Sequence, residues 1–233
     1  MIAVIDPRMP SSAKARLKEI CEVIELPPFS ALDARVASHP DMLIFPFEGK
    51  LFVCKNYYKE AKEAIDKIIT GSELKLVLTD DILGSKYPND VKFNAFVLSE
   101  YLVGKRDSIS AAIKNQAENS GFQIADTSQG YAKCSTVVLD NAIITADKGI
   151  YNLTCGLGYD TLLVNPCDVA LRGYSCGFIG GASGVFGKKI YFCGDITKHQ
   201  NGTDIIDFCN KKGYEVISLS SEPLYDVGTI IFI

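Results

Sequence analysis

The feature that most constrains the fold is an internal repeat with the order strand, strand, helix, strand. The clearest copy covers residues 41–79, where two short apolar runs on either side of Gly49 are typical of a β-hairpin. Residues 58–68 then carry apolar side chains at helical spacing, and residues 74–78 form a third apolar run. This pattern predicts a ββαβ unit.

The same order recurs along the chain, and its fifth copy is split between the two ends. The units are residues 41–79, 93–125, 133–164, 177–219, and 225–233 joined to 1–26. A split unit is expected when a ring closes by pairing the last strand with the first, because that pairing satisfies backbone groups at the edges. We therefore predict that residues 2–5 pair with residues 227–233.

The predicted fold is α/β: one domain, residues 1–233, forming a five-bladed ββαβ propeller with pseudo-fivefold symmetry. The alternative is a doubly wound open sheet in which the hairpins are insertions. Such a sheet alternates single strands with helices, and these hairpins recur too regularly for that arrangement. The strand order distinguishes the two.

The composition excludes several classes of partner. The net charge is -4 and no basic cluster is present to bind phosphates, so nucleic acid is not an expected partner. No apolar run is long enough to cross a bilayer, and no signal peptide is visible, so we expect a cytoplasmic protein that does not bind membranes. The oligomeric state stays open.

Cysteine and histidine usage argues against a metal site. The eight cysteines are Cys21, Cys54, Cys134, Cys155, Cys167, Cys176, Cys193 and Cys209. No pair has CxxC spacing, and His39 and His199 have no acidic partner at the spacing of metal ligands. We expect reduced thiols, no metal and no cofactor.

The order of elements, with hairpin patterns such as residues 94–104 (NAFVLSEYLVG), resembles the pentein superfamily. That superfamily includes arginine deiminases, dimethylarginine hydrolases, amidinotransferases and a non-catalytic ribosome anti-association factor. The resemblance implies that the first strand of each unit lines a central axis. It also implies that functional groups project from the starts of those strands into a central pocket.

The residues at the implied catalytic positions depart from the family pattern. The stretch that should carry the nucleophilic cysteine, residues 225–229, has no thiol. Lys133 stands where the resemblance implies a histidine, and Asn94 stands where it implies an acidic residue. Asp41 and Asp226 are the carboxylates that remain near the axis, so the family's chemistry cannot be carried over residue by residue.

Cys134 is the candidate nucleophile, because it lies near a predicted strand start beside Lys133, a cation that would favour the thiolate. We expect it to react with alkylating reagents faster than Cys21 or Cys209. The alternative is an inert buried thiol, with Lys133 solvated at a strand end. The candidate ligand-binding residues are Asp41, Asn94, Lys133, Ser183 and Asp226.

Residues 177–184 (GFIGGASG) form the most unusual string in the chain. Glycine permits close backbone approach, so the string forms either an anion-binding loop or a crowded strand start near the axis. It lacks the spacing of a P-loop. His39, before Pro40, either lies exposed or places its imidazole near the pocket rim.

Two functions remain open. One is a divergent hydrolase or transferase acting on amidino- or guanidino-type small molecules, with Cys134 or a bound water as nucleophile. The other is a non-catalytic module that binds a small ligand or a macromolecule. A central pocket with convergent polar groups would favour a small ligand, whereas packed side chains would favour a surface partner. With Lys133 in place of histidine, we expect no release of citrulline from arginine.

Overall fold

The computed structural model describes all 233 residues and contains five separate three-stranded sheets. The strands are β1 (Ile2–Ile5), β2 (Glu22–Glu25), β3 (Ile44–Phe47), β4 (Lys50–Cys54), β5 (Lys75–Thr79), β6 (Phe96–Leu98), β7 (Tyr101–Gly104), β8 (Gln123–Asp126), β9 (Thr136–Val138), β10 (Ala142–Thr145), β11 (Asp160–Leu163), β12 (Ser183–Phe186), β13 (Lys189–Phe192), β14 (Glu215–Ser218) and β15 (Ile231–Phe232). The helices are α1 (Ser11–Lys18), α2 (Pro40–Leu43), α3 (Lys55–Thr70), α4 (Ala111–Asn119), α5 (Lys148–Gly156) and α6 (Gly202–Lys211), with a 3-10 turn at Ile196–Lys198.

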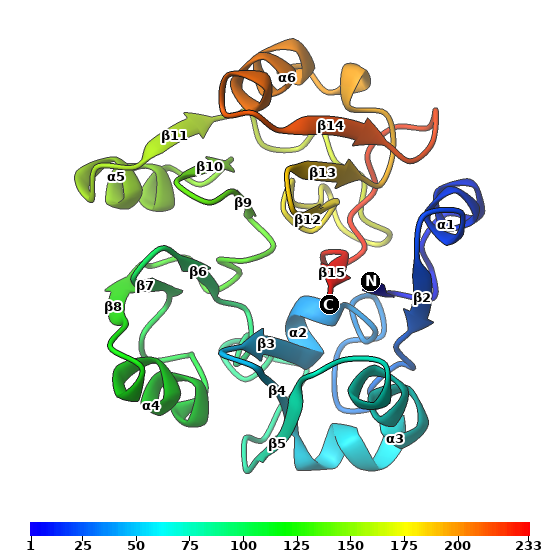
Figure 1. Ribbon diagram of the computed structural model, residues 1–233, viewed down its shortest axis with the longest axis vertical. Coiled ribbons are helices and arrows are strands. Elements are labelled where there is room, and N and C mark those ends of the chain that lie inside the picture. Colours follow the sequence, from blue (N-terminus) through cyan, green and yellow to red (C-terminus); the bar gives the residue numbers. More distant parts are fainter.

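Every sheet contains one antiparallel pair and one parallel pair, and a helix joins the two parallel strands. The split unit is present: Ala3 of β1 lies opposite Phe232 of β15, and β1 also pairs in parallel with β2. The predicted pairing of the two chain ends is therefore confirmed for residues 231–233, whereas residues 227–230 bond to Gly181 and Ser183 of the fourth unit instead of to β1. A single open sheet is wrong. Figure 1 shows β3, β6, β9, β12 and β15 toward the middle of the molecule and the long helices outside them.

The middle strand of each sheet is mostly buried, whereas most residues of the third strand are half-buried or exposed. All four residues of β1 and all four of β10 are buried. In β14 no residue is fully buried, and its first residue is the charged Glu215. Continuous apolar runs suit strands covered on both faces, and exposed charged residues discourage pairing at an open edge. No strand ladder joins one sheet to the next, so the five sheets are separate.

The strands nearest the middle begin later than predicted. Residues 41–43 lie in the single turn α2, which begins at Pro40, and β3 starts at Ile44. Likewise β6 starts at Phe96 rather than at residue 93, and β12 starts at residue 183 rather than at residue 177. The preceding residues bond to one another across the middle of the molecule: the Asp41 N–H, for example, donates to the Gly228 carbonyl at 3.0 Å.

The expectation that all eight cysteines are reduced is wrong for one pair. Cys167 and Cys176 form a disulfide across a sequence separation of 9 residues. The segment between β11 and β12 that holds them has no helix or strand, so the chain can turn back on itself and bring the two sulfur atoms together. The other six cysteines are free. No helix is long and apolar enough to span a membrane.

Candidate functional site

Three of the predicted residues meet in the middle of the molecule, together with one that was not predicted. Cys134 Sγ donates to Asp41 Oδ2 at 3.0 Å, and Asn94 Nδ2 donates to that sulfur at 3.0 Å. Thr229 Oγ1 donates to the same Asp41 oxygen at 2.7 Å. Each of these four side chains is at most 3% exposed. We call Asp41, Asn94, Cys134 and Thr229 the axial cluster.

The cluster is held by backbone contacts of the strand starts. Asn94 Oδ1 accepts from the backbone N–H groups of Lys133 at 2.8 Å and Cys134 at 3.1 Å. An amide that both donates and accepts can bridge two segments in this way. Asn94 therefore fixes the position of the thiol relative to the second unit.

The surroundings of Cys134 favour the neutral thiol. Burial raises the pKa of Cys134 well above its usual value, and the nearby carboxylates of Asp41 and Asp226 raise it further. Lys133 makes no hydrogen bond to the sulfur that would counter this rise in the pKa of Cys134. Its Nζ donates instead to the Thr136 carbonyl at 3.2 Å. Burial also lowers the pKa of Lys133. These surroundings favour a neutral Cys134 thiol that donates a hydrogen bond to Asp41, in contrast to the thiolate expected from the sequence.

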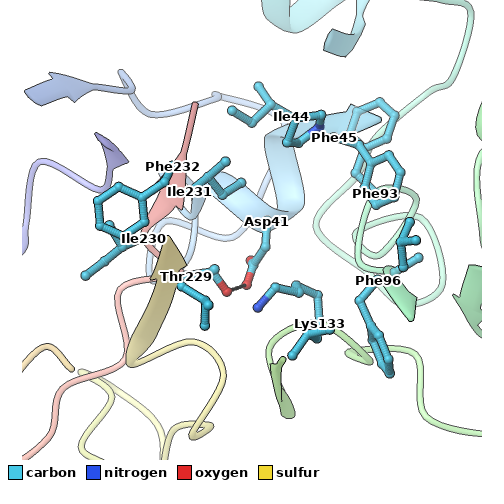
Figure 2. Close-up of a pocket in the computed structure, with 15 residues that line it drawn as sticks. Asp41, Ile44, Phe45, Phe93, Phe96, Lys133, Thr229, Ile230, Ile231 and Phe232 are labelled. Atoms are coloured by element: carbon cyan, nitrogen blue, oxygen red, sulfur yellow. Dashed lines mark hydrogen bonds between the residues drawn. The ribbon is translucent and has the colours of Figure 1, made fainter. Parts of the chain in front are cut away.

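A cavity of about 230 Å³, which we call the central pocket, lies beside the axial cluster. Asp41, Lys133 and Thr229 supply polar groups at one end of it, and their side chains point toward one another in Figure 2. The remaining wall is mostly apolar and includes Ile44, Phe45, Phe93, Phe96, Ile230, Ile231 and Phe232. Asp41 Oδ1 is buried and has no hydrogen-bond partner. Cys134 does not line this pocket.

Asp226 lies close enough to Cys134 to influence its pKa, but it lines a different cavity, of about 410 Å³, which we call the His39 cavity. Its carboxylate accepts from the backbone N–H groups of Phe178 and Gly228, both at 2.9 Å. Burial raises the pKa of Asp226, and His39 opposes that shift. His39 Nδ1 lies 3.9 Å from Asp226 Oδ1, and His39 Nε2 lies 3.8 Å from Asp6 Oδ2.

His39 itself is 3% exposed, so the first alternative, an exposed loop histidine, is wrong. Asp6, which follows β1, was not singled out from the sequence, because no local pattern places it beside His39. No group of three or more His, Cys, Asp or Glu side chains is placed to hold a metal ion.

The glycine-rich string is a crowded strand start. A Cβ at Gly180 would lie 2.4 Å from the carbonyl oxygens of both Lys133 and Thr136. Ser183 is buried, and its hydroxyl donates to the Gly180 carbonyl at 3.0 Å rather than facing the central pocket. Backbone N–H groups at positions 177, 178 and 181 are already bonded within the protein. The string therefore serves close packing, and these donors are not free for an anion.

Comparisons with known proteins agree with the fold. A family model described as "Family of unknown function (DUF6873)" matches residues 4–231. No curated protein matches the chain. An amidinotransferase of the saxitoxin pathway from Microseira wollei is similar in structure, with a TM-score of 0.56 and 10% identity over 92% of this chain and 76% of that chain.

Two further structures are similar. A dimethylarginine dimethylaminohydrolase from Pseudomonas aeruginosa, in complex with citrulline, has a TM-score of 0.54 and 9% identity over 94% of this chain and 91% of that chain. An agmatine deiminase from C. jejuni has a TM-score of 0.52 and 10% identity over 94% of this chain and 76% of that chain. All three are pentein superfamily members, so the predicted resemblance is confirmed. Identities this low establish the fold alone.

Proposed function

Because the chain belongs to DUF6873, a family of unknown function, its activity must be inferred from its own site, and we propose that the central pocket binds a small molecule through an amidino or guanidino head group. The observation that carries this proposal is Asp41 Oδ1, a buried acceptor without a partner at the polar end of an otherwise apolar cavity. A buried carboxylate oxygen without a donor is costly, and a ligand N–H group would supply one.

The chemistry of the pocket favours a planar cation joined to an apolar body. Cys134 and Thr229 occupy Asp41 Oδ2, which leaves Oδ1 for the ligand. A cationic N–H donor forms a charge-assisted hydrogen bond with a carboxylate, and the aromatic wall can cover the rest of the ligand. Lys133 lines the same end of the pocket, and burial lowers the pKa of its ammonium. The proteins of similar structure are named as an amidinotransferase, a dimethylarginine dimethylaminohydrolase and an agmatine deiminase, and these names support the choice of head group.

We also infer that the five units form a five-bladed propeller around a pseudo-fivefold axis, with the central pocket near that axis. Two features support this arrangement. The first strands of all five units face the middle of the molecule in Figure 1, and the fifth unit is completed by the pairing of β15 with β1. A ring of this kind brings the starts of five strands together, which explains how residues from four units can meet in the axial cluster.

Benzamidine is a suitable probe because it joins an amidinium to an apolar ring, and benzamide is its uncharged counterpart. We expect isothermal titration calorimetry to show saturable binding of benzamidine and much weaker binding of benzamide. Asp41→Asn should weaken benzamidine binding about 10- to 100-fold, the effect of losing a charge-assisted hydrogen bond. Asp207→Asn, which changes an exposed carboxylate on α6, should leave binding unchanged. Equal affinity for the two compounds, or unaltered binding by Asp41→Asn, would refute the proposal.

Catalysis at Cys134 is a second candidate, favoured by one contact. The thiol donates to Asp41, a carboxylate that could take its proton, and Asn94 donates to the sulfur and would stabilise a thiolate. Burial opposes that ionisation, and the sulfur does not line the central pocket. We therefore expect a colorimetric assay to detect no citrulline from arginine. Turnover that is abolished by Cys134→Ala would establish the catalytic function instead.

A further inference from the structure

The segment between β11 and β12 carries the protein's disulfide on its surface. Residues 165–178 contain no helix or strand, and Cys167 is exposed while Cys176 is half-buried. A disulfide in this position is accessible to a thiol reagent in solution, because thiol–disulfide exchange requires access to one of the two sulfur atoms.

The same segment forms part of the wall of two cavities. Leu171, Arg172 and Gly173 line the His39 cavity. Cys167 and Cys176 themselves line a third cavity of about 210 Å³, which also contains His199 and which we call the His199 cavity. The protein has two histidines, and one lies in each cavity, with exposures of 3% for His39 and 4% for His199.

The two halves of the segment are anchored unequally. At the first half, Val169 is buried in the core, and the Ala170 N–H donates to the Leu224 carbonyl at 2.9 Å. The second half, residues 171–175, is tied to the rest of the protein by Arg35, whose Nη1 donates to the Gly173 carbonyl at 3.0 Å. The Arg35 guanidinium also lies 4.1 Å from the centroid of the Tyr174 ring. Exposed contacts of this kind are weak, so residues 171–175 are restrained mainly at their ends, by the disulfide and by the hydrogen bond from the Gly177 N–H to the Val169 carbonyl at 2.7 Å.

We propose that the Cys167–Cys176 disulfide is a redox-controlled cover for these two cavities. In the oxidised protein the cross-link holds residues 171–175 against the His39 cavity, and its own atoms close one side of the His199 cavity. When it is reduced, the cross-link no longer restrains the segment, and both histidines become accessible to reagents in solution.

The redox step is exchange with a dithiol. One thiolate of the dithiol attacks a sulfur of the disulfide, forms a mixed disulfide and releases the other cysteine. The second thiol of the dithiol then displaces the remaining cysteine. Two electrons and two protons pass to the protein, which gains the thiols of Cys167 and Cys176, and the dithiol leaves as a disulfide. No residue of the segment lines the central pocket, so this inference and the proposed ligand site can fail separately.

The rate at which a reagent in solution modifies His39 and His199 measures how accessible the two cavities are. Oxidised and dithiothreitol-reduced protein, freed of reductant, are treated with diethyl pyrocarbonate, and the modification of each histidine is followed by peptide mass spectrometry. We expect both histidines to react about tenfold faster after reduction, as local opening becomes less restrained, and to slow again after reoxidation. A Cys167→Ser, Cys176→Ser double variant should react fast under both conditions. Cys155→Ser, which removes an exposed thiol, should keep the full response to reduction.

Three results would overturn the inference. The first is a non-reducing mass spectrum in which Cys167 and Cys176 are not linked. The second is an equal modification rate in oxidised and reduced protein. The third is a response of one histidine alone, because the cover is shared by both cavities. If the double variant does not fold, reversible reduction of the wild-type protein decides the question by itself.

Discussion

At the scale of single residues, Asp41 has the most constrained environment in the axial cluster. Its backbone N–H is bonded to the Gly228 carbonyl, and its Oδ2 accepts from two side chains that belong to other units. These contacts fix the carboxylate and leave Oδ1 without a donor. A preorganised acceptor of this kind costs little further entropy when a ligand binds.

Lys133 should make the free energy of unfolding depend on pH. Burial lowers the pKa of its ammonium in the folded protein below the value of about 10.4 expected in the unfolded chain. Between those two pKa values the unfolded chain binds more protons, so this residue makes the free energy of unfolding rise with pH. In urea titrations we expect the stability of the wild type relative to Lys133→Met to increase from pH 7 toward pH 10. Lys59→Met, at an exposed position of α3, should show no such trend. A pH-independent difference for Lys133→Met would contradict this account.

Gly180 tests the crowding around the strand starts. Because an added Cβ would meet backbone oxygens at 2.4 Å, we expect Gly180→Ala to reduce the free energy of unfolding by about 2–4 kcal/mol. Gly156→Ala, at the end of α5, meets no atom within 4 Å and should be neutral or stabilising by up to about 1 kcal/mol. Chemical unfolding of both variants compares the two sites. Equal stability of Gly180→Ala and wild type would show that the strand start is not crowded.

At the scale of elements, hydrophobic periodicity was sufficient to predict the ββαβ order and the pairing of the chain ends. It placed the starts of the strands nearest the middle too early, because apolar residues such as Met42 and Phe93 continue the strand pattern into segments that turn across the middle of the molecule. Those turns are stabilised by contacts between units, such as the bond from Asp41 to Gly228, and no local pattern encodes them.

The same limit applies to the site. Asp41, Asn94 and Cys134 could be proposed because the resemblance to the pentein superfamily implies functional groups at strand starts, and the structure brings these three residues together. Thr229 lies in residues 225–229, where the sequence stands out by its missing cysteine, and nothing in that stretch indicates that the Thr229 hydroxyl bonds to Asp41. The ionisation of Cys134 depends on burial and on carboxylates from other units, which sequence neighbours such as Lys133 do not indicate.

The pairing of β15 with β1 is the element-level contact most open to a direct test. Removal of residues 231–233 eliminates the pairs Ala3–Phe232 and Val4–Ile231 and also part of the wall of the central pocket. We expect the free energy of unfolding in urea to fall by about 2–5 kcal/mol, and benzamidine binding to weaken as well. Ile82→Ser, which alters an exposed apolar side chain, should change neither. A truncated protein as stable as the wild type would contradict the role assigned to this pair.

At the scale of the whole molecule, five small sheets of similar construction place their least regular segments in the middle and their long helices outside (Figure 1). The sheets supply rigid frames, and the strand starts supply side chains from different units to one place. This division explains how the pentein fold can be retained while the residues at its centre differ. In this chain the centre offers a fixed carboxylate beside an apolar pocket.

The most direct test of the central claim is a crystal structure of the protein grown with benzamidine. The account predicts the amidinium in the central pocket, with a nitrogen about 3 Å from Asp41 Oδ1 and the ring against the aromatic wall. Benzamidine bound instead in the His39 cavity against Asp226, or a central pocket without ligand at saturating concentration, would contradict it.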